Sequence, residues 1–211
     1  MILYHGSDVI VEKPLYGYGK RNNDYGQGFY CSADIELARE WACKSLKGGF
    51  LNVYRFDTDG MNTLRLDERN VLEWIAVLLS NRTIRYSSPI EKRASEHIIK
   101  HYSIDLSPFD VVIGYRADDS YFSFARAFLS NTITVEQLSR ALKLGNLGIQ
   151  YFLNTPQAFE KLTFVESEPV FGEIYYPRKD AREEGAREQY YKLLEEDDSK
   201  GLYISDLLKE S

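Results

Sequence analysis

Three short stretches of the chain combine glycines with polar or aromatic side chains that could do chemistry. The first is Tyr4-His5-Gly6-Ser7, and the second carries two aromatic residues, Tyr30 and Trp41, eleven positions apart. The third carries Gln150 near the start of a late apolar stretch. Two aromatic rings can hold a flat ring between their faces and favour a cationic one, while glycine lets backbone groups approach a ligand closely. These residue types predict a cleft for a flat, charged small molecule.

In order and spacing, these stretches resemble the ADP-ribosyltransferase superfamily, in the branch of diphtheria-type toxins and poly(ADP-ribose) polymerases. That branch carries a His-Gly on its first strand, then a Gly-x-Tyr strand and a second aromatic residue on the following helix. His5, Tyr30 and Trp41 stand at the matching positions. The fuller pattern resembles a poorly characterised bacterial toxin-like family over roughly residues 2 to 165, through Asn81-Arg82, Ile113-Gly114 and Ala117-Asp118-Asp119.

The resemblance implies that the chain binds NAD⁺ as a co-substrate, without a metal, and transfers ADP-ribose to a macromolecular acceptor. Cleavage of NAD⁺ breaks a glycosidic C–N bond through an oxocarbenium-like state. Tyr30 and Trp41 are candidates to sandwich the nicotinamide, and the resemblance implies that His5 bonds the adenosine-side ribose. The candidate NAD⁺-binding residues are His5, Gly6, Ser7, Gly28, Phe29, Tyr30, Trp41 and Arg82.

Each of these residues also has a plainer interpretation. His5 alone suits a strand histidine bonded to backbone, Tyr30 an ordinary strand tyrosine, and Trp41 the core face of a helix. Their joint order, their spacing and the neighbouring glycines favour the cleft. Arg82 and Arg116 are candidate partners for the NAD⁺ pyrophosphate, with surface salt bridges as the alternative.

Gln150 stands where the superfamily carries a glutamate. A carboxylate there bonds the nicotinamide-ribose 2′-hydroxyl and stabilises positive charge at the anomeric carbon. Glutamine keeps the hydrogen bond but supplies no charge and cannot act as a base. We therefore expect a carboxylate from elsewhere, with Asp118 and Asp119 as first candidates and a solvated turn as their alternative. Weaker candidates are Glu136, Glu160 and Glu166. The candidate catalytic residues are His5, Tyr30, Gln150, Asp118 and Asp119.

Three functions are compatible with such a cleft. The leading hypothesis is a mono-ADP-ribosyltransferase, and the resemblance implies a bacterial toxin or defence effector held by an antitoxin protein. NAD⁺ glycohydrolysis, with water as acceptor, is the first alternative. A catalytically silent module that binds NAD⁺ or ADP-ribose is the second, and the glutamine at position 150 favours it.

Short strands and separate helices alternate irregularly along the chain, which favours an α+β fold; the resemblance implies an ADP-ribosyltransferase-like split β-sandwich with helical insertions. Thr134 is expected to cap a helix, with Gln137 in the capping-box position, and Ser32 to cap the helix that begins near Asp34. The expected strands are 2–5, 29–31, 51–56 with its partner 63–66, 109–114, 149–153 and 162–165. The expected helices are 35–46, 71–79, 94–102, 122–129, 135–144 and 155–162.

Composition narrows the class of protein. The chain has 211 residues, of which 44% are hydrophobic, so a sizeable core is expected. Its net charge of −6 argues against binding nucleic acid mainly through phosphates, and favours protein over nucleic acid as acceptor.

The N-terminus is not that of a signal peptide, and no apolar run suits a membrane span. With only Cys31 and Cys43, we expect reduced thiols and a cytoplasmic protein.

The C-terminal segment differs from the rest. Residues 178–211 are rich in charged residues of both signs and are expected to form a solvated helix followed by a short amphipathic piece at 202–208. Packing back on the domain, or binding a partner, are the alternatives. We expect an NAD⁺-binding domain over residues 1–177 and a charged helical extension over 178–211.

Overall fold

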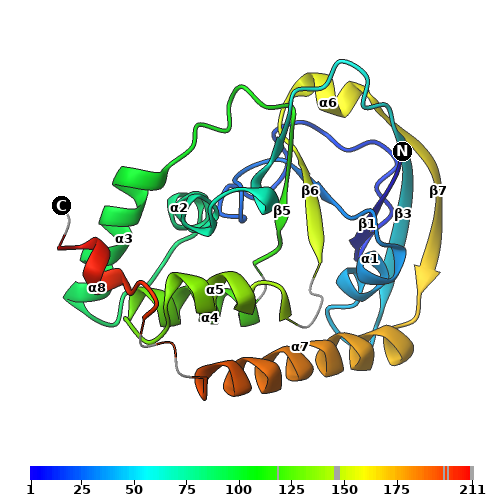
Figure 1. Ribbon diagram of the computed structural model, residues 1–211. Helices are drawn as coiled ribbons and strands as arrows, with labels where there is room; N and C mark the ends of the chain where they lie inside the picture. Colours follow the sequence, from blue (N-terminus) through cyan, green and yellow to red (C-terminus); the bar gives the residue numbers. More distant parts are fainter. Residues whose placement is uncertain (118, 145–147, 197, 199, 210–211) are drawn as a thin grey trace.

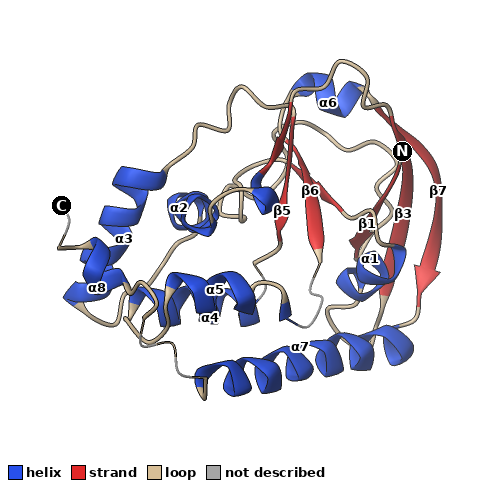
Figure 2. Cartoon of the chain, in the orientation of Figure 1, coloured by secondary structure: helices blue, strands red, loops and turns tan. Residues whose placement is uncertain are grey.

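The computed structural model describes residues 1–117, 119–144, 148–196, 198 and 200–209. Within them the strands form two sheets, and the helices lie around these sheets (Figures 1 and 2). The expected α+β class is therefore confirmed.

The first sheet is antiparallel, with the order β1 (Ile2–Ser7), β3 (Gly49–Phe56) and β7 (Leu162–Val170). β7 extends five residues beyond the strand expected at 162–165, because it pairs with the whole of β3. The register places His5 opposite Asn52. The β3 residues from Leu51 to Tyr54, and Phe56, are buried. This strand therefore anchors the sheet in the core.

The second sheet has the order β2 (Phe29–Cys31), β6 (Ile149–Leu153), β5 (Val111–Tyr115) and β4 (Thr63–Arg65). The expected pairing of residues 63–66 with residues 51–56 is wrong. β4 instead lies parallel to β5, with Leu64 opposite Val112. Both of these side chains are buried in the main core, so burial rather than chain proximity sets the pairing.

The two sheets meet at Tyr4 and Ser32. The Tyr4 backbone N–H donates to the Ser32 carbonyl oxygen and the Ser32 N–H donates to the Tyr4 carbonyl oxygen, each at 2.8 Å. This bridge fixes the middle of β1 beside the end of β2. It therefore brings the neighbouring residues His5 and Tyr30 together.

The helices begin at side-chain caps in most cases. Thr134 and Gln137 form the expected capping box of α5. Asp34, rather than Ser32, caps α1, because its carboxylate accepts from two N–H groups of the first turn, while the Ser32 hydroxyl accepts from the Asp34 N–H. The helices are α1 (Ile35–Ala42), α2 (Val71–Asn81), α3 (Pro89–Tyr102), α4 (Asp119–Leu129), α5 (Val135–Ala141), α6 (Pro156–Glu160), α7 (Gly172–Leu194) and α8 (Ile204–Leu207), with a short 3₁₀ turn at Leu66–Glu68.

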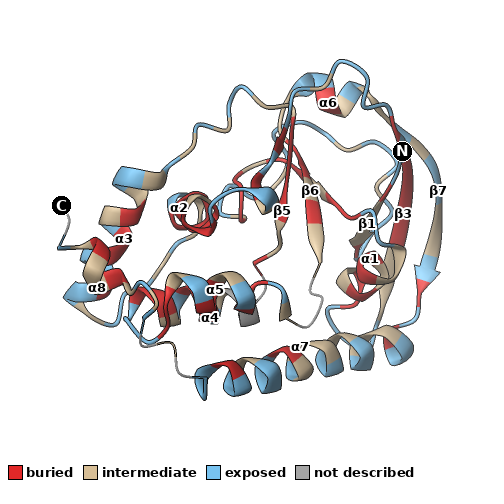
Figure 3. Ribbon diagram, in the orientation of Figure 1, coloured by how far each residue is buried: buried red, intermediate tan, exposed pale blue. Residues whose placement is uncertain are grey.

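The largest core lies between the second sheet and α2, α4 and α5 (Figure 3). The α2 residue Trp74 is fully buried there, and its indole N–H donates to the Tyr115 carbonyl oxygen at 3.0 Å. A second cluster, with Leu3 and Phe29, fills the space between the two sheets. Both cysteines are buried free thiols. Among the described residues, no helix has the length and apolar character needed to cross a membrane.

Helix α7 runs along the lower edge of the molecule in Figure 1 and packs on α1, α4 and α5. The expectation of a solvated helix is wrong, because Ala186 and Leu193 are buried and the Tyr190 ring stacks on Phe124 at 4.3 Å. The boundary expected between residues 177 and 178 falls inside this helix.

Candidate functional site

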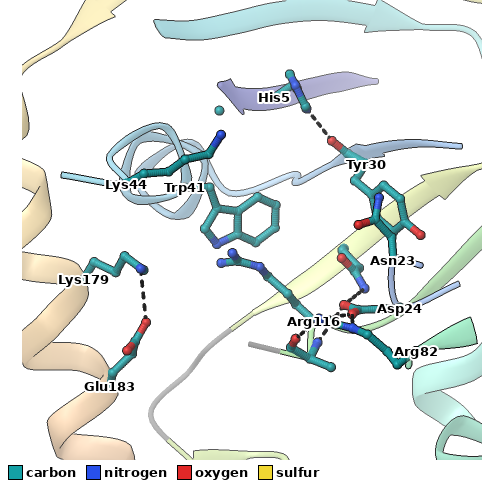
Figure 4. A pocket seen from close by; sticks show the side chains of 13 residues that line it. His5, Asn23, Asp24, Tyr30, Trp41, Lys44, Arg82, Arg116, Lys179 and Glu183 are labelled. Carbon is teal, nitrogen blue, oxygen red and sulfur yellow. Dashed lines mark hydrogen bonds and ion pairs between the residues drawn. The ribbon is translucent and has the colours of Figure 1, made fainter. Parts of the chain in front are cut away.

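A pocket of about 400 Å³ opens where the ends of the two sheets, α1 and α7 come together (Figure 4). Seven of the residues singled out from the sequence line it: His5, Gly6, Tyr30, Trp41, Arg82, Arg116 and Gln150. Further lining residues are Asn23, Asp24, Lys44, Ala117, Lys179 and Glu183. Residues from β1, β2, α1 and β6 thus share one cavity.

The His5 ring has a defined orientation. Its Nδ1 lies 2.7 Å from the Tyr30 carbonyl oxygen; because a carbonyl can only accept, Nδ1 carries the proton. Burial lowers the pKa of His5, with a further lowering by the Lys44 charge, against raising effects of the Tyr30 carbonyl and Asp8. The imidazole is therefore neutral at pH 7 and presents Nε2 as a hydrogen-bond acceptor.

The lowered pKa of His5 makes the protein less stable in mild acid. Between its folded-state pKa and the ordinary value of ~6.5, the unfolded chain binds more protons, so stability falls as pH drops below ~6.5. The variant His5→Asn removes this titration, so we expect its unfolding free energy to fall less between about pH 7 and pH 5 than that of wild type. Urea unfolding at several pH values measures it, and identical slopes for both proteins would refute it.

Tyr30 is held as a wall of the pocket. Its hydroxyl donates to the Gly26 carbonyl oxygen at 2.7 Å and accepts from the Tyr25 N–H at 3.1 Å. Its ring lies 4.9 Å from that of Phe152. Burial also raises the pKa of Tyr30 well above its usual range. Tyr30 can therefore offer a ring face to a ligand, but not a titrating hydroxyl.

Trp41 projects from α1 into the middle of the pocket, and the Arg116 guanidinium lies over its ring at 4.5 Å from the centroid (Figure 4). The same indole face can attract another flat cation. The position of Trp41 depends on Gly6, because a Cβ at Gly6 would collide with the carbonyl oxygen of Ala38 and the N–H of Ala42. Glycine here lets α1 lie directly on β1.

Asp24 is a buried carboxylate at the base of the pocket, 5% exposed. Arg82 donates to its Oδ1 from Nε at 2.9 Å and from Nη2 at 2.6 Å. Its Oδ2 accepts from the Ala117 N–H at 2.9 Å and from Gln150 Nε2 at 3.0 Å. Arg82 Nη2 also donates to the Ala117 carbonyl oxygen at 2.6 Å. Arg82 therefore serves Asp24. Two further cations line the pocket: Arg116, which lies over the Trp41 ring, and Lys44, which pairs with Asp8 at 3.4 Å.

Several candidate residues do not line this pocket within the described part of the chain. The Ser7 hydroxyl donates to the Val9 carbonyl oxygen and accepts from Asn52. Gly28 is needed for packing, because a Cβ would strike Phe152, and Phe29 is a core residue. Glu136 accepts from the Leu202 N–H.

Two of the expected catalytic carboxylates, Asp118 and Asp119, follow β5 in the sequence. Asp118 lies outside the described residues. Asp119 begins α4, and its side chain is also outside the described part of the structure.

Comparison with known proteins gives one assignment. The family model described as "protein of unknown function (DUF3990)" matches residues 1–164. The chain belongs to the DUF3990 family. Among curated proteins, no sequence matches the chain.

The matched DUF3990 region supplies every pocket residue except two. Lys179 and Glu183 come from α7, which lies beyond the matched residues. Their side chains are paired at 3.5 Å and are 28% and 13% exposed. A smaller hollow shares Trp41, Arg116, Lys179 and Glu183 with this pocket but is not lined by His5 or Tyr30. In this chain, α7 thus forms a wall of a site that the family domain otherwise builds.

An ion pair fastens that wall to α1. Arg182 donates from Nε and Nη2 to the two carboxylate oxygens of Glu40, each at 2.8 Å, and Glu40 adjoins Trp41 in sequence. The Glu40 side chain is 5% exposed. Arg178 adds an exposed ion pair with Glu36 at 3.1 Å.

Replacing Arg182 with alanine should lower the free energy of unfolding by about 2 kcal/mol, because a buried carboxylate loses its partner. Arg178→Ala is the matched control on the same helix, and we expect a loss below about 1 kcal/mol from this exposed pair. Urea denaturation followed by circular dichroism measures both. Equal losses in the two variants would show that the Arg182–Glu40 pair adds nothing beyond an exposed pair.

Sequence reasoning missed five side chains that line the site: Asn23, Asp24, Lys44, Lys179 and Glu183. Asp24 stands in the loop just before Tyr25-Gly26, and its position beside the motif was the available signal. Lys179 and Glu183 belong to a helix whose charges are spread around its circumference, and no sequence signal separated them from the rest. Among the described residues, no group of histidine, cysteine, aspartate or glutamate side chains is arranged to hold a metal ion.

Proposed function

We propose that this DUF3990 protein is an NAD⁺-dependent mono-ADP-ribosyltransferase with an ADP-ribosyltransferase-like split β-sandwich fold. One observation carries the proposal. His5, Tyr30 and Trp41, which match ordered motifs of that superfamily, line a single pocket with Gln150, which stands at the position of its glutamate. Two facing sheets joined at the Tyr4–Ser32 bridge are compatible with the fold.

The chemistry of the pocket suits the parts of NAD⁺. A pyridinium ring can lie against the Trp41 indole in place of, or beside, the Arg116 guanidinium. The His5 Nε2 can accept from a ribose hydroxyl, and Lys44 and Arg116 bring positive charge for a pyrophosphate. These cations line the pocket of a protein whose net charge is −6, so the local charge favours an anion despite the overall balance.

A second candidate is an NAD⁺-binding module without turnover. The observation that favours it is Gln150, whose amide has no charge to stabilise an oxocarbenium ion. The nearest described carboxylate, Asp24, already accepts four hydrogen bonds. NAD⁺ glycohydrolysis differs from ADP-ribosyl transfer only in using water as acceptor. One assay separates transfer, glycohydrolysis and binding without turnover.

The test is incubation of the purified chain with cell lysate and NAD⁺ radiolabelled on its adenylate phosphate. Transfer gives labelled macromolecule, and digestion with protease or nuclease tells protein from nucleic acid as acceptor. Free ADP-ribose without labelled macromolecule indicates glycohydrolysis. Titration calorimetry on the same preparation measures NAD⁺ binding; no binding at millimolar NAD⁺ would overturn the proposal.

The proposed role as a toxin or defence effector has its own test. Induced expression of the chain in bacteria is expected to arrest growth, whereas Trp41→Ala expressed at the same level is expected not to. A neutralising partner protein is then sought as a suppressor of the arrest. Unimpaired growth of cells that express the wild-type chain would argue against toxicity.

A further inference from the structure

We propose that Asp24 is a positioning residue that acts on the reacting ribose through the amide of Gln150. This inference rests on the proposed function, and it addresses how a site with glutamine at this position can favour a developing positive charge. The residues concerned come from the loop before β2, from the end of α2, from the segment after β5 and from β6. They meet at one buried carboxylate.

The Asp24 carboxylate has no hydrogen-bonding capacity left for a ligand. Its two oxygens offer about four lone-pair sites, and four donors occupy them: two from Arg82, one from the Ala117 backbone and one from Gln150. It therefore neither contacts the ribose nor takes up a proton from an acceptor without breaking this arrangement. Any effect on the reaction passes through a neighbour.

Gln150 is the neighbour that lines the pocket, and its amide has one orientation. Nε2 donates to Asp24 Oδ2 at 3.0 Å and to the Tyr115 carbonyl oxygen at 3.2 Å. Both partners can only accept, so the flipped amide would set Oε1 against two other acceptors. Both N–H groups are thus used, and Oε1 is the atom that remains for a ligand. Gln150 can only accept from a ribose hydroxyl.

The hydrogen bond to Asp24 also changes the charge on Oε1. A bond from an amide N–H to an ionised carboxylate is charge-assisted, and in a buried network it polarises the amide so that its oxygen becomes more negative. Arg82 opposes this, but it binds Oδ1 whereas Gln150 binds Oδ2. The negative charge of Asp24 thereby reaches Oε1, the acceptor that Gln150 can offer to a ribose hydroxyl.

The first experiment compares Asp24→Asn with wild type by steady-state kinetics of nicotinamide release. An asparagine amide must set its NH₂ against either Arg82 or the donors from Ala117 and Gln150. In either orientation, the negative charge beside the Gln150 amide is lost. We expect kcat to fall about tenfold or more, while KM for NAD⁺ changes less than about threefold. The matched control is Asp67→Asn, which alters an Arg–Asp pair outside the pocket and should leave both constants unchanged.

The second experiment uses a readout that needs neither turnover nor the stability of Asp24→Asn. Gln150→Glu places a carboxylate beside Asp24, so the pKa of the pair should rise above the ordinary glutamate value of ~4.3. NMR of the isotope-labelled carboxyl that this substitution introduces at position 150 follows the titration. A midpoint at the ordinary value would show that Asp24 does not act on position 150.

The outcomes separate the two proposals. Absence of NAD⁺ binding by wild type overturns the proposed function, whatever the titration of Gln150→Glu gives. If wild type releases nicotinamide and folded Asp24→Asn has wild-type kcat and KM, the positioning role is overturned while the function stands. A raised midpoint in Gln150→Glu together with a selective fall in kcat supports the positioning role.

Discussion

Asp24→Ala is expected to lower the free energy of unfolding by about 3 kcal/mol, because it leaves a partly buried cation without its partner. Removing the carboxylate deprives Arg82, the Ala117 N–H and the Gln150 amide of their acceptor at once. Each buried donor left unsatisfied adds to the loss. The Arg82 side chain is 35% exposed, so water solvates part of it. The expected loss of unfolding free energy is therefore at the lower end of the range for breaking a buried ion pair.

Urea denaturation of wild type and Asp24→Ala measures the effect. The control is Asp67→Ala, which removes the carboxylate of another Arg–Asp pair, whose Arg65 side chain is 47% exposed. We expect that control to lose about 1 kcal/mol or less. Losses of the same size in both variants would mean that the Asp24 network contributes no more than the Arg65–Asp67 pair, whose side chains are 47% and 10% exposed.

Trp41→Ala is expected to weaken NAD⁺ binding about 30-fold, which corresponds to about 2 kcal/mol. The variant removes the ring that the nicotinamide cation would face, and it also removes the surface on which Arg116 lies. Because Trp41 is only partly buried, the fold should tolerate the change. Titration calorimetry with NAD⁺ measures the affinity.

Trp41→Phe provides the matched comparison. Phenylalanine keeps an aromatic face, although a smaller one, so it should recover most of the affinity. Thermal melting shows whether both variants are folded to the same extent. If alanine and phenylalanine bind NAD⁺ as tightly as tryptophan does, the ring at position 41 has no part in recognising the nicotinamide.

Local signals predicted those parts of the fold that local interactions determine. The Thr134–Gln137 capping box is present because both of its hydrogen bonds form within one helical turn. The strand at 149–153 has the expected bounds, because its buried residues allow this strand only one position in the sheet. His5, Tyr30 and Trp41 were predicted to share a site because their spacing matched an ordered motif, and they line the same pocket.

Features set by distant contacts could not be predicted in the same way. The apolar residues at 63–66 suit an antiparallel partner and a parallel one equally well, and only the burial of Leu64 against Val112 decides. Asp24 looks like a loop residue until Arg82 and Gln150 are brought to it by other elements. The docking of α7 depends on single residues such as Arg182, whose partner Glu40 lies 142 positions away.

The spread of the site along the chain has a consequence for its synthesis. Residues that line the pocket run from His5 to Glu183, and the strand that carries Gln150 pairs with both β2 and β5. A ribosome releases the chain from its N-terminus, so β1, β2 and α1 emerge long before β6 and α7 do. A nascent chain therefore lacks Gln150 until β6 has been made, and it lacks Lys179 and Glu183 until α7 has been made. A translation product that ends before α7 has no complete pocket.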